Sequence, residues 1–185
     1  MTRRLSANAL GLTVVLVIAA CGSASKDSKS SPRPTTGLSP ARTTTSIPAA
    51  FPAQAARVCA AVAPRLKTTV QEVNTVNAQS GNPLAKLPKL ARLLRQISAE
   101  IGTLREGLAE LTPPVGQGAA FARFLKDLGV LRTLSATMAT DLRSGTIAGL
   151  DRYRPLAARF SARGAALEIH RMKVPALSAC RNIGR

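Results

Sequence analysis

The chain has 185 residues, of which 45% are hydrophobic but only 3% are aromatic, with one tyrosine and no tryptophan. Alanine and leucine dominate the apolar residues, so the composition favours helices and disfavours an aromatic, β-branched sheet core. The formal net charge of +17 predicts attraction to anionic surfaces, among them lipid headgroups, wall polymers and nucleic acid. The arginine excess is explained equally well by a GC-rich genome, so the charge alone does not choose a partner.

Residues 1–20 have the three parts of a signal peptide. Arg3 and Arg4 supply the positive start, Ala9 to Ala20 form an apolar stretch, and small residues follow at its end. The stretch is shorter than the roughly 20 apolar residues that a membrane-spanning helix needs. Removal of the two arginines lowers the formal net charge from +17 to +15.

The signal ends in Ile18-Ala19-Ala20-Cys21, which resembles the bacterial lipobox. The resemblance implies a diacylglyceryl group on the Cys21 sulfur, cleavage before this residue, and anchoring on the extracytoplasmic face of the cell membrane. Two or three acyl chains hold a protein firmly, whereas one chain binds only marginally. An ordinary cleavable signal with a chance cysteine and an uncleaved anchor are the alternatives.

Residues 21–50 form the expected tether between this anchor and the folded domain. The segment is rich in Ser, Thr, Pro and Gly and has no apolar period, so it cannot bury enough surface to offset its ordering entropy. We expect a lipidated, disordered spacer, either bare or carrying O-linked glycans on its Thr and Pro clusters.

Residues 51–185 are expected to form one all-α domain, because apolar residues recur at alternating spacings of three and four in four successive runs. The runs are Cys59, Val62, Leu66, Thr69, Val73 and Val76; Leu90, Leu94, Ile97, Ile101, Leu104, Leu108 and Leu111; Phe121, Phe124, Leu128, Leu131, Ser135, Met138 and Leu142; and Leu150, Tyr153, Ala157, Phe160, Gly164, Leu167 and Val174. The fourth run is the least regular, with Pro155 inside it and Arg171 at an apolar position.

Short polar turns separate the four runs, at Asn82-Pro83, Thr112-Pro113-Pro114 and Ser144-Gly145-Thr146. Pro64 and Pro88 mark either kinks or later helix starts. Because short loops make consecutive helices antiparallel, the sequence predicts an up-down-up-down four-helix bundle. A two-helix oligomerising coiled coil is the competing architecture.

Cys59 and Cys180 are the two thiols that remain after lipidation of Cys21, one near the start of the first helix and one just after the fourth. An antiparallel bundle brings these two ends to the same pole. In the oxidising compartment of an exported protein we therefore expect a Cys59–Cys180 disulfide. Two free thiols or a redox pair are the alternatives, although neither cysteine lies in a Cys-x-x-Cys motif.

The sequence carries no recognisable catalytic or metal-binding pattern, so we expect neither an enzyme nor a cofactor. His170 is the single histidine and is expected on a partly solvated helix face, and a metal site would need several such ligands. Glu106 and Glu110 lie one turn apart, which fits a solvated face better than an acid pair for hydrolysis. Phosphate-binding loops and nucleophile elbows do not occur.

The last helix is strongly basic, with six cations and two acids between residues 151 and 173. Arg152, Arg159 and Arg163 share one flank, which indicates either a docking strip for an anionic surface or a solvated basic face. Nucleic acid is not expected as the natural partner, because export removes the domain from the genome and aromatic residues for base stacking are scarce.

Several features together resemble small uncharacterised lipoproteins of actinobacteria: the lipobox, the Ser/Thr/Pro spacer, Arg57-Val58-Cys59, Leu111-Thr112-Pro113-Pro114 and the closing Val174-Pro175-Ala176-Leu177-Ser178-Ala179-Cys180. The resemblance implies a membrane-anchored helical bundle closed by a disulfide and transfers no catalytic residue. We expect a non-enzymatic module that binds an envelope protein or an anionic polymer. The alternative is a bundle that binds a lipid or small ligand, in which Ala157 and Gly164 leave space, although close helix packing is the explanation we favour for these small residues.

Overall fold

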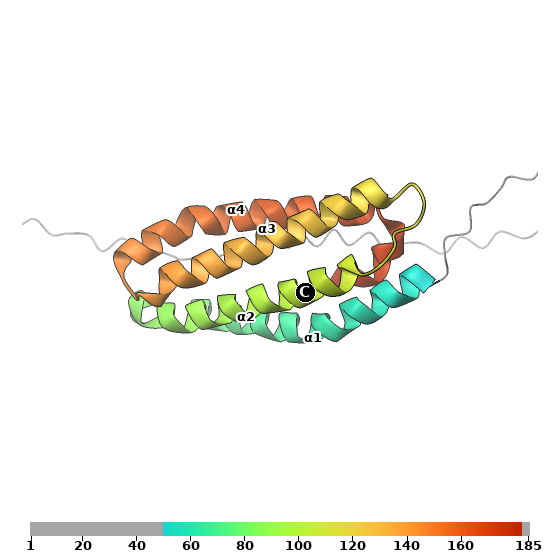
Figure 1. Cartoon of the computed structure of the whole chain (residues 1–185). Helices are drawn as coiled ribbons and strands as arrows, with labels where there is room; N and C mark the ends of the chain where they lie inside the picture. Colours follow the sequence, from blue (N-terminus) through green and yellow to red (C-terminus); the bar gives the residue numbers. More distant parts are fainter. Residues whose placement is uncertain (1–49, 183–185) are drawn as a thin grey trace, which may run out of the picture.

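The computed structural model describes residues 50–182, which form four long α-helices and one short 3-10 helix (Figure 1). The α-helices are α1 (Ala50–Ala78), α2 (Pro83–Ala109), α3 (Gly118–Arg143) and α4 (Ile147–Met172), and η1 (Pro175–Asn182) follows. The expected signal peptide, the lipidation of Cys21 and nearly all of the expected tether lie outside the described residues. Ala50, which we assigned to the tether, is the first residue of α1.

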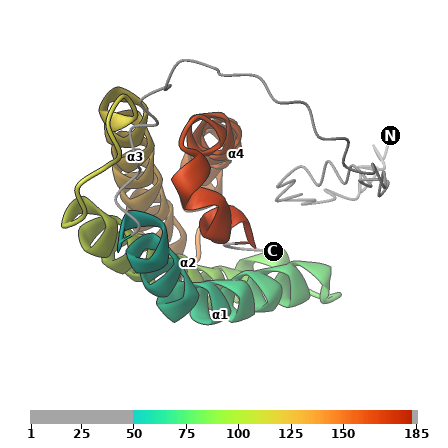
Figure 2. The same ribbon diagram turned by 90° about the vertical axis from the view of Figure 1, so that its right-hand side faces the viewer.

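The predicted all-α antiparallel bundle is confirmed. Within residues 50–182 there are no strands, and α2 packs on α1, α3 on α2, and α4 on α3, each pair running in opposite directions (Figure 1). Helix α4 does not pack extensively on α1 or α2, and η1 instead connects that side by contacting both α1 and α4. Viewed along the helices, the bundle is therefore less tightly closed between α1 and α4 than on its other sides (Figure 2).

The predicted turns set the helix ends. The Asn82 side chain accepts a hydrogen bond from the Leu84 N–H at 3.0 Å, and Pro83 occupies the first helical position, where a missing N–H costs nothing. Thr146 caps α4 by accepting from Gly149 N–H at 3.2 Å. Gly145 has φ +65°, a backbone conformation that favours glycine. Helix α2 ends at Ala109, slightly before the Pro113-Pro114 pair.

Three prolines lie inside helices rather than at their starts. Pro64 is within α1, Pro88 within α2 and Pro155 within α4, and each helix continues through its proline. Of the two alternatives for Pro64 and Pro88, a later helix start is therefore wrong, since α1 and α2 begin before these prolines. Proline costs an internal hydrogen bond, so packing of the apolar faces must offset this loss.

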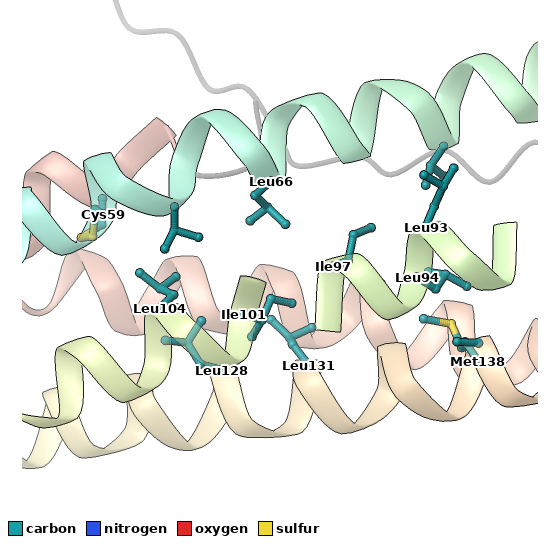
Figure 3. Close-up of a cluster of buried hydrophobic side chains, with 14 of the residues drawn as sticks. Cys59, Leu66, Leu93, Leu94, Ile97, Ile101, Leu104, Leu128, Leu131 and Met138 are labelled. Atoms are coloured by element: carbon teal, nitrogen blue, oxygen red, sulfur yellow. A yellow bond between two sulfur atoms is a disulfide. The ribbon is translucent and has the colours of Figure 1, made fainter. Parts of the chain in front are cut away.

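The core is formed mainly by α1, α2 and α3. Every apolar residue of the first three predicted runs is buried except Leu111, which is partly buried. Leu66 of α1, Leu104 of α2 and Leu128 of α3 belong to the same buried cluster (Figure 3). Gly107 permits α1 and α2 to approach closely, because a Cβ there would lie 2.9 Å from Val58 Cγ1. The fourth run is less buried, since only Gly149, Leu150 and Tyr153 of α4 are buried.

The Cys59–Cys180 disulfide is present and joins α1 to η1. Its Cα atoms are 5.3 Å apart although 121 residues separate the two cysteines in the sequence. Both cysteines are buried, and Val174 and Leu177 beside them are fully buried as well. The pole where α1 begins is thus also the pole where η1 lies, as the antiparallel topology predicted.

Candidate functional site

The most distinctive polar cluster lies between α3 and α4 and is centred on Asp127. The side chain of Asp127 is only 3% exposed, because it lies on the face of α3 that packs on α4. Arg163 Nη1 donates to Asp127 Oδ1 at 2.8 Å, and His170 Nδ1 lies 2.5 Å from Asp127 Oδ2. A buried carboxylate needs such partners, because an unpaired charge in the protein interior is very costly.

The cluster fixes the orientation of the histidine ring. An ionised carboxylate only accepts hydrogen bonds, so His170 donates its Nδ1–H to Asp127 and Nε2 is the ring nitrogen left for other contacts. The imidazole is 22% exposed. A pair of this kind can orient a catalytic base, but within residues 50–182 Asp127 is the one hydrogen-bond partner of the His170 side chain. In the described bundle the cluster therefore acts as a polar connection between α3 and α4.

A second ion pair connects the same two helices at the opposite pole. Arg152 Nε donates to Asp141 Oδ1 at 2.9 Å, and the Asp141 side chain is 15% exposed. Here α3 and α4 approach so closely that a Cβ on Gly149 would lie 2.2 Å from the Asp141 carbonyl oxygen. Each pole of the α3–α4 interface thus has its own carboxylate from α3 and arginine from α4.

Arg171 occupies the apolar position that made the fourth run irregular. Its guanidinium donates to both carboxylate oxygens of Glu168, from Nε at 2.8 Å and from Nη2 at 2.6 Å. The hydrogen bond to Glu168 raises the pKa of Arg171, with the nearby charge acting in the same direction and burial opposing it. The pairing explains how an arginine side chain that is 11% exposed remains charged in this position.

The three arginines predicted to form a docking strip have different surroundings. Arg152 and Arg163 form the ion pairs with Asp141 and Asp127, whereas Arg159 is exposed and has no ion pair within the described part of the chain. Binding of an anionic surface through these residues stays a prediction. Of the three arginines, only Arg159 thus has a guanidinium without an ion pair in residues 50–182, whereas Arg152 and Arg163 join α4 to α3.

Asp127 is the residue that sequence reasoning missed. Its position three residues after Phe124 and four before Leu131 places it in an apolar row, which is an unusual location for an acid. Arg163 and His170 are seven residues apart on the next helix, so they share one face of α4. An acid within an apolar row, together with two hydrogen-bond donors on one face of the next helix, was the sequence pattern that could have predicted this cluster.

Helix α4 also carries apolar residues that are only partly buried, namely Leu156, Ala157, Phe160 and Leu167. A Cβ added at Gly164 would meet no atom within 4 Å. Close helix packing, one of the two explanations considered for this glycine, is therefore not its role here. Burial raises the pKa of Tyr153, which lies on the same helix nearer its start.

The other candidate chemistries have little support in the described bundle. Glu106 belongs to an exposed ion pair with Arg132, 3.2 Å from Nη1 to Oε1. Among residues 50–182 no three His, Cys, Asp or Glu side chains are grouped as metal ligands, and none of the four long helices is apolar enough to cross a membrane.

No protein-family model, curated protein or solved structure matches this chain.

Proposed function

We propose that the chain is a secreted lipoprotein, anchored through Cys21 on the extracytoplasmic face of the cell membrane, whose helical domain is a non-enzymatic interaction module. The observation that supports this proposal most directly is the Cys59–Cys180 disulfide. Buried structural disulfides are typical of exported proteins and rare in reducing compartments. The bridge thus agrees with the address that the Ile18-Ala19-Ala20-Cys21 motif indicates.

The position of the disulfide also fits a tethered protein. It ties η1 to the N-terminal half of α1, the helix that a tether would enter at Ala50. A force on the tether would then act on a helix that is covalently bonded to the C-terminal part of the domain. The opposite pole and the exposed sides of the bundle would remain available to an envelope protein or an anionic polymer.

The lipid anchor is tested by mass spectrometry of the N-terminal peptide from a bacterial host that processes lipoproteins. We expect cleavage before Cys21, a diacylglyceryl mass on this residue and recovery of the protein in the membrane fraction. The Cys21→Ser variant is the matched control and should be neither lipidated nor cleaved at this site. An unmodified Cys21 in the mature protein would refute the anchor.

The interaction role is tested by crosslinking intact membranes and recovering the lipoprotein. The control carries residues 1–50 fused to an unrelated small domain, so that it has the same anchor and tether. We expect at least one envelope component to be enriched with the full chain and absent with the control. Equal recovery from both proteins would contradict an interaction role for the bundle.

A protein that binds a lipid or small ligand is the second candidate, and it is favoured by the side of the bundle between α1 and α4, where these helices do not pack extensively on each other. Partly buried apolar residues on α4, the free space at Gly164 and the lack of extensive α1–α4 packing together offer a place where an apolar molecule would increase burial. Native mass spectrometry of the protein purified without detergent tests this candidate. A bound lipid that is lost in a Gly164→Leu variant would support it, and ligand-free protein with no thermal shift on adding fatty acids would exclude it.

A further inference from the structure

The exposed face of α2 carries a row of residues with alternating spacings of three and four. The row, which we call the outer row of α2, consists of Lys89, Arg92, Gln96, Ala99, Thr103, Glu106 and the C-cap residue Glu110, which directly follows α2. All seven residues are exposed, while the opposite face of the same helix supplies eleven buried residues to the core. This spacing is the one that keeps a row of residues along one side of a helix and facing a neighbouring helix.

The charges along the outer row are arranged symmetrically about Ala99 and with opposite signs. Arg92 lies seven residues before Ala99 and Glu106 seven residues after it, and Lys89 and Glu110 lie ten before and eleven after. Within the row, the three residues between Arg92 and Glu106 are uncharged. When such a helix is paired with an antiparallel copy of itself, its basic half faces the acidic half of the copy.

The ion pairs within the chain leave this face available. Lys89, Arg92 and Glu110 have no ion pair in the described bundle, and Glu106 pairs only with Arg132, where both side chains are about half exposed or more. Acids are scarce in this protein, with nine against 26 lysines and arginines. Two of the nine nevertheless stand together at the end of α2.

The arrangement also opposes the helix dipole. Helix α2 has no acid in its first turn and no base in its last turn, although acids near the N-terminus and bases near the C-terminus would stabilise it. A copy packed antiparallel would place carboxylates beside the N-terminal half of α2 and cations beside its C-terminal half. Pairing thus corrects an arrangement that is unfavourable in the single chain.

We propose that the outer row of α2 is a self-association surface, on which a second copy of this chain binds antiparallel across a two-fold axis near Ala99. Lys89 then faces the carboxylate of the partner's Glu110, and Arg92 faces the carboxylate of the partner's Glu106. The row extends over about 30 Å of helix, so the contact is that of a small, transient interface. At about 0.15 M salt, charges farther apart than the Debye length of roughly 8 Å are screened from each other. Salt therefore weakens the long-range repulsion between two basic domains more than the attraction between ion-paired side chains in contact.

Charge reversal tests this proposal, using the chain from Gly22 to Arg185, which retains every described residue. One variant carries Lys89→Glu and Arg92→Glu, and the other carries Glu106→Lys and Glu110→Lys. Sedimentation equilibrium to about 1 mM protein should show a monomer–dimer equilibrium for the natural chain. Each variant alone should self-associate at least about tenfold more weakly, because like charges then face each other.

The decisive sample is the equimolar mixture of the two variants. In the antiparallel arrangement all four charge contacts are restored between unlike variants, so the mixture should form heterodimers at least as well as the natural chain forms homodimers. A matched control for the first variant, Arg123→Glu with Lys126→Glu on α3, makes the same change in net charge as Lys89→Glu with Arg92→Glu and should self-associate normally. A natural chain that stays monomeric, or a mixture that does not associate, would overturn the proposal.

Crosslinking gives a test of the register. An Ala99→Cys variant should form an intermolecular disulfide under mild oxidation, because the two copies of this residue lie close to the axis. Ala136→Cys, on the exposed face of α3, should not. Equal crosslinking of the two variants would contradict an axis at Ala99, even if the chain dimerises through another surface.

Discussion

Helices α2 and α4 are nearly equal in length, at 27 and 26 residues, but they are held in the bundle in different ways. Helix α2 supplies eleven buried residues to the core and packs on both α1 and α3. Helix α4 has three buried residues, and it is joined to α3 by the Asp127 cluster and the Asp141–Arg152 pair. Helix α2 is held by apolar burial on two sides, which is non-directional, whereas α4 packs on α3 through partly buried apolar residues and adds polar pairs that require specific partners.

The largest expected effect comes from removing apolar side chains on the two helices. Leu108 of α2 is fully buried, so Leu108→Ala should lower the free energy of unfolding by about 2–5 kcal/mol. Leu167 of α4 is only partly buried, so Leu167→Ala should cost less than about half as much. Urea denaturation of both variants measures the difference. Equal losses would show that α4 is packed as tightly as α2.

The polar connection of α4 is tested at its buried carboxylate. Asp127→Ala removes the partner of Arg163 and His170 at once and should cost about 2–3 kcal/mol, below the usual range for fully buried pairs because Arg163 is 41% exposed. Asp151→Ala is the matched control, since it removes an exposed pair with Arg154 and should cost less than about 1 kcal/mol. Similar melting temperatures for the two variants would count against a structural role for Asp127.

Two glycines of α4 should respond in opposite directions to alanine. Gly149→Ala would place Cβ against the Asp141 carbonyl oxygen, and we expect a loss of about 1–3 kcal/mol. Gly164→Ala meets no neighbour within 4 Å and should gain up to about 1 kcal/mol from its higher helix propensity. Thermal unfolding compares the two variants. A loss of stability at Gly164 would mean that α4 packs more closely there than the structure indicates.

The smallest effect concerns Tyr153, the single tyrosine, whose ionisation is visible near 295 nm without interference from tryptophan. Burial raises its pKa above the ordinary value of 10.0. The unfolded chain therefore loses this proton first, so the contribution of Tyr153 to stability is complete below about pH 10 and falls as the pH rises further. The folded protein should titrate at higher pH than the protein in urea, and identical titration midpoints would be inconsistent with a buried ring.

The same comparison separates what the sequence predicted from what it did not. For α1 to α3 the apolar spacing was sufficient, because rows such as Leu94, Ile97 and Ile101 face one core and their burial follows from periodicity alone. The disulfide followed from topology, since antiparallel helices bring Cys59 and Cys180 to one pole.

For α4 the spacing correctly located the helix but did not show how it is held. Its contacts depend on specific pairs between helices, such as Asp127 with Arg163 and His170, and the register of two helices is not encoded in the period of either one. The partly buried state of Phe160 and Leu167 depends likewise on the missing α1–α4 packing. Sequence reasoning therefore predicted the apolar core well and the polar site poorly.

Hydrogen exchange tests most directly the claim that α4, with few buried residues and a link to α1 only through the disulfide-bonded η1, is held less firmly than the core formed by α1 to α3. The experiment compares the natural chain with a Cys59→Ala, Cys180→Ala variant by mass spectrometry of peptides from each helix. We expect peptides of α4 and η1 to lose protection in the variant, while peptides of α2 keep most of theirs. Equal loss of protection in α2 and α4, or unchanged protection in α4, would contradict this account.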